Sequence, residues 1–289
     1  MLSCLIAAAL WAVSLSLYRR PIRDLGPAEV NLFKCAAAVA AYWVWILAVG
    51  PRAGLGGAGD WASLAASGVV GFTIGDLLLF VSVREGGVQR ALVLFNTSPL
   101  MTALLAIVVL GEIPPPRRWL GMGLVLAGVF LVETDPVRVA AAALRPARAR
   151  PWLATFAGLG AALGQSLGIL LSRGPLQTVP VLPATAIRLS AAVVTLAPLV
   201  AFAPSGLGFR GLAPRNWRRL LLPTILGTGI ALLFSMRGIR DVPAGVAASL
   251  LATTPIFALP ISRFVLDEPL GLRSVAGTMV AVGGVALLG

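Results

Sequence analysis

Two stretches decide the architecture of this chain: ALVLFNTSPL at residues 91–100 and AASLLATTPI at residues 247–256. The second lies 156 positions after the first, and the same offset places the whole segment 61–133 over 217–289 without a gap. Identical residues recur in this alignment where a backbone is constrained, as in Trp61 and Trp217, Gly71 and Gly227, Pro99 and Pro255, Glu112 and Glu268, and Gly121 and Gly277. Self-similarity at a fixed offset indicates a duplicated structural unit. The sequence therefore predicts two copies of one repeat.

The composition places these copies in a membrane. Hydrophobic residues make up 58% of the 289 residues, charged residues make up 12%, and the mean hydropathy is +0.93. A soluble domain carries about 25% charged residues, because its surface has to be covered with polar groups. A helix needs about 20 mainly apolar residues to cross the hydrocarbon. Such runs predict spans at residues 2–17, 29–49, 62–83, 88–110, 118–133, 152–171, 182–202, 217–236, 244–266 and 272–289.

The ten predicted spans divide evenly between the two copies. Five is an odd number, so the second copy enters the membrane from the opposite side. We therefore predict an all-α membrane protein with ten transmembrane helices as two inverted five-helix repeats, at 1–133 and 152–289, joined by a basic linker at 134–151. The first run lacks the flanking features of a cleavable signal peptide, so we interpret it as a span. Inverted repeats occur in many secondary transporters, and we expect a multi-pass protein of the plasma (inner) membrane.

The distribution of charge and the residue types that are missing exclude several classes of function. The net charge is +12, but nearly all basic residues are Arg in short gaps between apolar runs, where they contact lipid head groups rather than nucleic acid. The sequence contains no His, the commonest metal ligand and general base. It also contains no phosphate-binding loop of the GxxxxGK[ST] type. We expect no cofactor, no metal and no nucleic-acid partner.

The two quoted stretches share a further spacing. Pro99 and Pro255 are each followed 13 residues later by a glutamate, and a Gly-rich closing helix comes next in each copy. The doubled arrangement resembles the EamA-type ten-helix exporters of the drug/metabolite transporter superfamily, over essentially the whole chain. This resemblance implies export of amino acids or related metabolites through a central cavity, usually with proton or exchange coupling, and cytoplasmic termini. The distribution of Arg between the gaps favours the opposite orientation, so the side on which the termini lie stays open.

Polar groups at mid-membrane depth are candidates for solute binding. They can bond either a solute or the carbonyl one turn earlier in their own helix. The polar residues that surround the two mid-span prolines are Asn96, Thr97, Ser98, Thr253 and Thr254. A mid-helix proline removes a backbone hydrogen bond. We therefore interpret Pro99 and Pro255 as hinges, with a static packing kink as the alternative.

Three charged residues within predicted spans are candidates for function. Asp76 is a carboxylate deep in the third span, where it can carry a proton, bind an ammonium group or pair with a basic residue. Lys34 and Arg188 occupy corresponding positions in the second and seventh spans, and either can bind a solute carboxylate or extend to the head groups. The resemblance implies Arg at the position where Lys34 stands, and Asp76 has no acidic counterpart, because Leu232 occupies the matching position.

The remaining candidates divide into cavity-lining and structural residues. Trp11, Ser14 and Gln165 are expected to line the cavity from the first and sixth spans. Glu112 and Glu268 precede the last helix of each copy, where a carboxylate satisfies free N–H groups at a helix start. We interpret both as structural, together with Gly71 and Gly227, which permit close helix approach.

We predict a secondary transporter, not an enzyme, that exports small metabolites such as amino acids by alternating access. Two alternatives stay open: a membrane-embedded enzyme acting on lipid or isoprenoid substrates, and a non-transporting membrane subunit. The expected partners are a small-molecule solute and the lipid bilayer. Protons as the coupling ion, a homodimer, the identity of the substrate and the direction of transport stay open.

Overall fold

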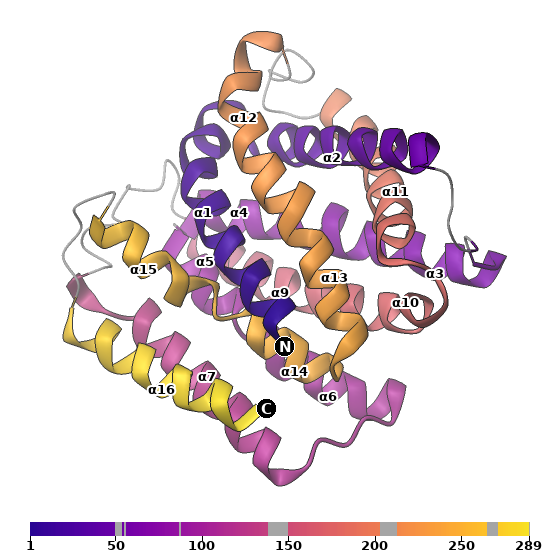
Figure 1. Cartoon of the computed structure of the whole chain (residues 1–289). Coiled ribbons are helices and arrows are strands. Elements are labelled where there is room, and N and C mark those ends of the chain that lie inside the picture. Colours follow the sequence, from indigo (N-terminus) through magenta and orange to yellow (C-terminus); the bar gives the residue numbers. More distant parts are fainter. Residues whose placement is uncertain are drawn as a thin grey trace.

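The computed structural model describes residues 1–49, 54, 56–86, 88–137, 150–202, 213–264 and 271–288, and within these ranges the chain is helical with no strand (Figure 1). Two of the elements, η1 and η4, are π-helical and η3 is a 3-10 turn. The elements are α1 (Leu2–Leu25), α2 (Pro27–Val49), α3 (Ala58–Gly68), η1 (Val69–Gly75), α4 (Asp76–Gly86), α5 (Val88–Phe95), α6 (Ser98–Leu110), α7 (Pro116–Glu133), α9 (Pro151–Arg173), α10 (Pro175–Thr178), α11 (Val181–Ala201), η3 (Pro214–Asn216), α12 (Trp217–Thr224), η4 (Ile225–Ala231), α13 (Leu232–Asp241), α14 (Ala244–Leu251), α15 (Thr254–Phe264) and α16 (Leu272–Leu288).

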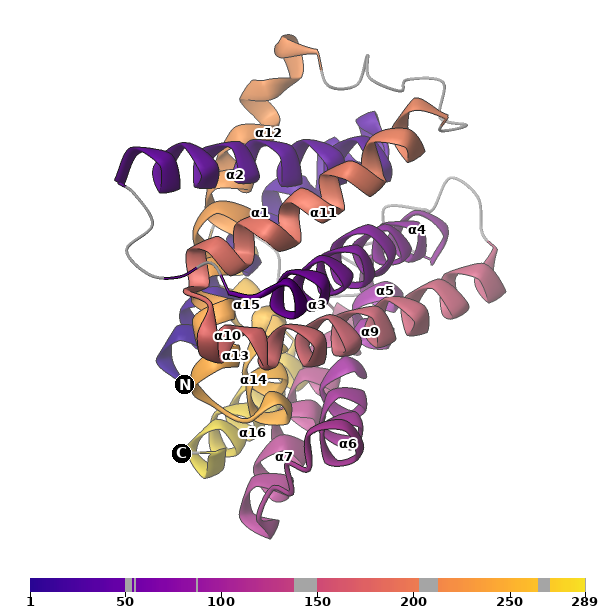
Figure 2. The ribbon, with the colours of Figure 1, turned by 90° about the vertical axis from the view of Figure 1, so that its right-hand side faces the viewer.

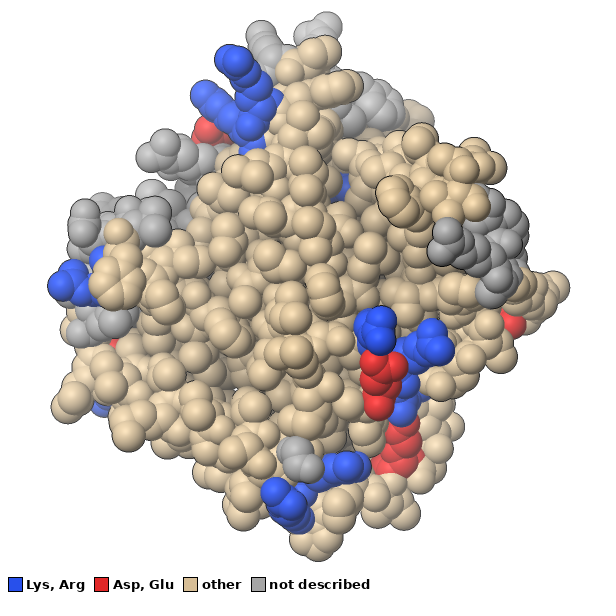
Figure 3. Space-filling model, in the orientation of Figure 1, with Lys and Arg blue, Asp and Glu red and all other residues tan. Residues whose placement is uncertain are grey.

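Seven helical stretches among the described residues are long and apolar enough to cross a membrane. They are Pro27–Val49, Ala58–Gly86, Ala91–Leu110, Pro151–Arg173, Val181–Ala201, Trp217–Asp241 and Ala244–Ile261. The apolar helices Leu2–Tyr18 and Leu272–Leu288 are shorter, and the 18 residues of α7 include three charged ones, Arg117, Arg118 and Glu133. In Figure 3 the charged side chains gather toward the upper left and lower right, and the surface between them is almost uncharged. The prediction of ten spans thus exceeds the seven that length and composition select.

The offset of 156 residues recurs in the local backbone. The π-helical segment Val69–Gly75 has a counterpart at Ile225–Ala231. The helix that ends at Phe95 and restarts at Ser98 has a counterpart that ends at Leu251 and restarts at Thr254. A π-helical segment frees carbonyl groups and is uncommon. Its appearance at matching positions therefore indicates that both copies keep one backbone design.

Helices α7 and α16 pack side by side and run antiparallel (Figure 1). Gly121 near the start of α7 meets Gly284 near the end of α16, whereas Gly128 meets Gly277. These four glycines are two pairs of counterparts, so the contact is reciprocal, as in an interface with twofold symmetry. A Cβ on Gly128 would lie 2.4 Å from the Gly277 carbonyl oxygen, and a Cβ on Gly277 would lie 2.5 Å from the Gly128 oxygen. The backbones can approach this closely only because both residues lack a side chain.

The first helix of each predicted repeat packs on the other repeat. Helix α1 contacts η4, α13 and α15, whereas α9 contacts η1, α4 and α6. Figure 2 shows α9 alongside α3 and α4, and α2 alongside α11. The contact of α9 with η1 is again close, since a Cβ on Gly164 would lie 3.0 Å from the Gly75 Cα. The two predicted repeats are therefore intertwined in space.

Helix α1 is longer than the predicted span. It continues through Pro21 to Leu25, although the sequence Arg19-Arg20-Pro21 suggested an end near residue 17. A proline within a helix removes one backbone hydrogen bond, and here the helix continues past it. The adjoining Gly26, at φ 102°, then turns the chain into α2.

Candidate solute-binding cavity

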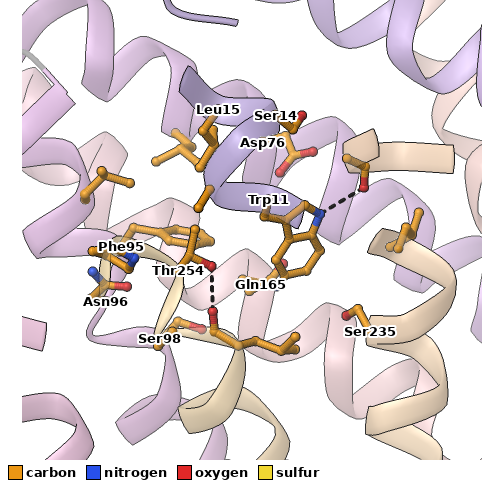
Figure 4. A pocket seen from close by; sticks show the side chains of 18 of the residues that line it. Trp11, Ser14, Leu15, Asp76, Phe95, Asn96, Ser98, Gln165, Ser235 and Thr254 are labelled. Atoms are coloured by element: carbon orange, nitrogen blue, oxygen red, sulfur yellow. Dashed lines mark hydrogen bonds between the residues drawn. The ribbon is translucent and has the colours of Figure 1, made fainter. Parts of the chain in front are cut away.

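A cavity of about 240 Å³ lies among α1, α2, η1, α4 to α7, α9, α11, η4 and α13 to α15. Both broken helices contribute to its wall, through Ser98 and Pro99 on one side and Thr254 and Pro255 on the other. In Figure 4, Trp11 projects from α1 into this space toward Gln165. The wall combines aromatic and aliphatic side chains with a small number of polar groups, which is typical of a small-molecule site.

Most of the predicted binding residues meet at this cavity. Those that line it are Trp11, Ser14, Lys34, Asp76, Asn96, Ser98, Gln165, Arg188 and Thr254, with Pro99, Pro255 and Gly227. Two predicted binding residues, Thr97 and Thr253, and the predicted structural glycine Gly71 do not line it. Thr97 and Thr253 turn back onto their own backbone, where each hydroxyl donates to a carbonyl three residues earlier. Gly71 lies behind the wall, where a Cβ would be 3.5 Å from Nη2 of Arg188.

Lys34 and Asp76 form an ion pair in the cavity wall. Lys34 Nζ donates to Asp76 Oδ2 at 2.5 Å, and the side chains are only 12% and 18% exposed. The ammonium group also lies over the Phe80 ring, 5.3 Å from its centroid. Burying two charges is costly unless they pair closely. Of the roles considered for Asp76, pairing with a basic residue is the one present in this conformation.

Arg188 is a buried cation without a carboxylate partner among the described residues. Its side chain is 3% exposed, and the guanidinium lies over the Phe72 ring with Cζ 5.0 Å from the centroid. Nη1 donates to the weak acceptor Met236 Sδ, and Nε has no hydrogen-bond partner in the described part of the chain. The backbone at this point is fixed by Gly68, because a Cβ there would lie 2.0 Å from the Arg188 carbonyl oxygen.

Side chains satisfy the carbonyl groups in and beside the two π-helical segments. Asn31 donates to Phe72 O at 2.7 Å in the first copy. In the second copy Trp11 Nε1 donates to Gly227 O at 2.9 Å, and Ser14 Oγ donates to Pro223 O at 2.8 Å. Tyr42 donates to Thr228 O and Gly229 O at 2.6 and 2.7 Å. Gly227 has to be glycine here, because a Cβ would lie 2.2 Å from Ser14 Oγ.

The prolines stand at helix starts rather than in mid-helix. Pro99 is the second residue of α6, and Pro255 is the second residue of α15. Proline is well tolerated in the first turn, where its missing N–H would have no intrahelical partner. The break itself falls at residues 96–97 and 252–253, so the predicted kinks are interruptions between two short helices.

Glu112 lies at a junction between four helices, beyond one end of the cavity. Its Oε1 accepts from Arg173 Nε at 2.7 Å, and its Oε2 accepts from the Ala244 N–H at 2.8 Å. Glu112 therefore meets the first residue of α14 in the other copy rather than its own next helix, α7. Arg173 also donates to the carbonyl of Ile239, which lines the cavity. The counterpart Glu268 lies outside the described residues.

Sequence reasoning missed several residues of this site. Met236 and Phe72 contact Arg188, and Ser235 and Glu133 also line the cavity. The repeat offers a signal for Met236, because its counterpart 156 residues earlier is Phe80, which contacts Lys34. Glu133 is buried at the end of α7, a place where the sequence pattern suggested the membrane surface.

The comparisons with known proteins agree with this architecture. The chain matches the model of the EamA-like transporter family over residues 1–134 and 152–289. Its fold is similar to that of a solved crystal structure at a TM-score of 0.75 and 18% identity, covering 99% of this chain and 94% of that one. That likeness concerns the fold alone.

Short stretches of the chain are also similar to curated bacterial proteins described as probable 4-amino-4-deoxy-L-arabinose-phosphoundecaprenol flippase subunit ArnE. The protein of Pseudomonas paraeruginosa is 37% identical over 87 residues, which are 30% of this chain and 71% of that protein. The protein of Erwinia tasmaniensis is 36% identical over 66 residues, 23% of this chain and 61% of that protein. The first relative is thus less than half as long as this chain.

The seven apolar stretches and these relatives together make the chain a multi-pass protein of the inner membrane. The family match extends over nearly all of the chain. The chain belongs to the EamA-like transporter family.

Proposed function

We propose that this chain moves a solute across the inner membrane by alternating access, between two inverted five-helix repeats that form a ten-helix bundle. The antiparallel, reciprocal packing of α7 and α16 supports the opposite orientation of the repeats. The π-helical segments and the helix breaks at matching positions support their equivalence. Two equivalent halves of opposite orientation can exchange conformations, which opens a central site to one side and then to the other.

One observation carries the proposal: the cavity lies where both broken helices meet, and its wall holds buried charges. Asp76, Lys34 and Arg188 all face this space. Ionisable groups at membrane depth are costly and therefore usually serve function. Broken helices also free backbone groups beside the site, as in other transporters with inverted repeats.

The junction around Glu112 supplies a closure in this mechanism. It joins the ends of α6, α9 and α13 to the start of α14 at one end of the cavity. Arg173 and Glu112 are 17% and 23% exposed, so their charge-assisted contact is partly shielded from water. We infer that this junction holds its end of the cavity shut in the conformation described, and that it separates when that end opens.

The relatives favour an amphiphilic substrate over the free amino acid expected from the sequence. The proteins of Pseudomonas and Erwinia are described as subunits of a flippase for a lipid-linked amino sugar phosphate. Phe72, Phe80 and Phe95 give the cavity an apolar wall beside its charged groups. The cavity is too small for a polyprenyl chain, so a lipid tail would remain in the bilayer while the head group enters. Export of such a head group, with no chemical step, is the function that we propose.

Flux measurements on purified protein in proteoliposomes test this function. One arm follows the translocation of an undecaprenyl-phosphate-linked amino sugar, and a second follows counterflow of free amino acids, each with and without a pH gradient. We expect translocation in the first arm, in wild-type protein and not in empty vesicles. A dependence on the pH gradient would assign proton coupling. Folded protein that moves nothing in either arm would contradict the proposal and favour a non-transporting subunit.

A further inference from the structure

We propose that Arg188 is an anion-binding group, and that the substrate carries a phosphate or carboxylate that docks on it. The proposal deepens the function proposed above and rests on it. Its starting point is the difference between Arg188 and its counterpart Lys34, since Asp76 neutralises Lys34 and no carboxylate oxygen of the described residues lies within 4.0 Å of the Arg188 guanidinium.

Burial makes this lack of a partner informative. A cation taken out of water without a counter-ion costs several kcal/mol, and Arg188 is 3% exposed. What it contacts instead is the Phe72 ring and the Met236 sulfur. Ring faces and thioether sulfurs are weak partners for a guanidinium. A ligand oxyanion would supply the strong, charge-assisted hydrogen bonds that the described residues do not provide.

The duplicated fold explains why the partner is missing. In the first copy, α4 contributes Asp76 to the cation and Phe80 one turn later. In the second copy, α13 contributes Leu232 and, one turn later, Met236. Positions 80 and 236 are counterparts, and both contact their cation. Leu232 therefore stands at the position from which a carboxylate would reach Arg188, and it lines the cavity.

A second donor in the same cavity points to the same ligand chemistry. Asn96 lines the cavity, and its buried Nδ2 finds no hydrogen-bond partner among the residues that the structure describes. Buried polar groups are almost always hydrogen-bonded. Two such donors in one cavity, Arg188 Nε and Asn96 Nδ2, call for a ligand that brings acceptors. A phosphate or carboxylate on a hydroxylated head group has this character.

Binding measurements on full-length protein in nanodiscs test the inference. The probes are undecaprenyl phosphate in the disc lipid, a free sugar phosphate, and L-glutamate, so that lipid-linked and free anions are distinguished. The deciding pair is Leu232→Asp and Leu232→Asn, which differ almost only in charge. We expect Leu232→Asp to weaken binding of the anion about tenfold or more, because it supplies an internal partner to Arg188. The uncharged variant Leu232→Asn should bind the anion about tenfold or more tightly than Leu232→Asp, and the exposed neighbour variant Arg237→Gln should bind within about threefold of wild type.

Direct removal of the cation should agree with that pair. Arg188→Gln should lose anion binding, and Arg188→Lys should retain part of it. If Arg188→Gln does not fold, the Leu232 pair alone decides. Equal affinities for Leu232→Asp and Leu232→Asn would overturn the inference. Flux of uncharged or cationic solutes alone would also overturn it while leaving the transport function intact, whereas anion binding without any flux would overturn transport and keep the Arg188 site.

Discussion

The two halves of the molecule share their backbone design, but they differ in whether a buried cation is paired with a carboxylate. In the first half Lys34 is held at 2.5 Å by Asp76. In the second half Arg188 has Leu232 and Met236 on the facing helix and no acidic partner among the described residues. The π-helical segments, the broken helices and the glycine contacts between α7 and α16 are by contrast the same in both halves. The two halves thus share the backbone features that the proposed movement requires, whereas their charges differ where a solute would bind.

Loss of the acidic partner in the first half has the largest expected effect. Asp76→Asn leaves the Lys34 ammonium buried without a counter-ion, and breaking one side of a buried pair costs about 3 kcal/mol. We expect the free energy of unfolding to fall by about that amount, measured by SDS titration of protein in mixed micelles. Leu232→Asn in the second half breaks no ion pair, so its cost comes only from the lost apolar contacts and the buried amide.

The double variant Lys34→Met with Asp76→Leu is the control for this comparison. It removes both charges together and should recover most of the lost stability, since a hydrophobic replacement of a buried pair is often neutral. If Asp76→Asn proved as stable as the double variant, the pair would not be what neutralises Lys34.

Substitution of matching glycines in the contact between α7 and α16 should lower the stability equally in the two halves. Gly128→Ala and its counterpart Gly284→Ala each drive a methyl group toward the backbone carbonyl of the facing glycine, at 2.4 and 2.7 Å. Overpacking of this kind costs about 2 kcal/mol, and we expect the same loss for both within error, by SDS titration. Gly123→Ala is the matched control, because nothing lies within 4 Å of the added Cβ. A clear inequality between the two variants would break the symmetry of this contact.

Asp135 gives the smallest expected effect, and it depends on pH. Burial raises the pKa of this carboxyl, but hydrogen bonds from the Ser274 hydroxyl and from the N–H groups of Ser274 and Val137, with the charge of Arg273, lower the pKa below its ordinary 3.8. A depressed pKa stabilises the fold above the unfolded value, and this stabilisation is lost as the pH falls through the folded pKa. Asp135→Asn should therefore cost about 1 kcal/mol at pH 7, as expected when a carboxylate at a helix start loses its charge.

The same variant should become indistinguishable from wild type in strong acid. Thermal unfolding followed at a series of pH values between neutral and about 3 would show the two curves converge. A constant difference across the whole range would mean that the charge of Asp135 does not stabilise the start of α16.

Much of the fold could be predicted because duplication leaves a periodic signal. The match between Pro99 and Pro255 located both broken helices, although it suggested kinks where the chain is interrupted. Apolar runs located the helices but missed the extension of α1 past Pro21 to Leu25, since a proline next to arginines usually marks a helix end. The π-helical segments had no signal in composition, because they depend on donors from other helices such as Asn31 and Trp11.

The charged residues of the site could be predicted from the sequence, because charged residues are rare within apolar runs. Asp76, Lys34 and Arg188 were recognisable on that ground, and all three line the cavity. Which cation would be paired was not predictable, because pairing depends on the distance between helices. Met236 and Phe72 look like ordinary core residues until their contact with Arg188 is seen. Glu112 was expected at a helix start, but the helix that it meets belongs to the other copy.

The sidedness of two matching positions tests the central claim most directly. Gly57 and Ala213 are counterparts at an offset of 156, each just before the third helix of its repeat. In a chain whose buried Cys4 and Cys35 are replaced by alanine, single cysteines at these positions can be labelled with a membrane-impermeant maleimide. We predict that the two cysteines react from opposite faces of the membrane. Reaction of both from the same face would contradict the inverted repeats and the transport mechanism built on them.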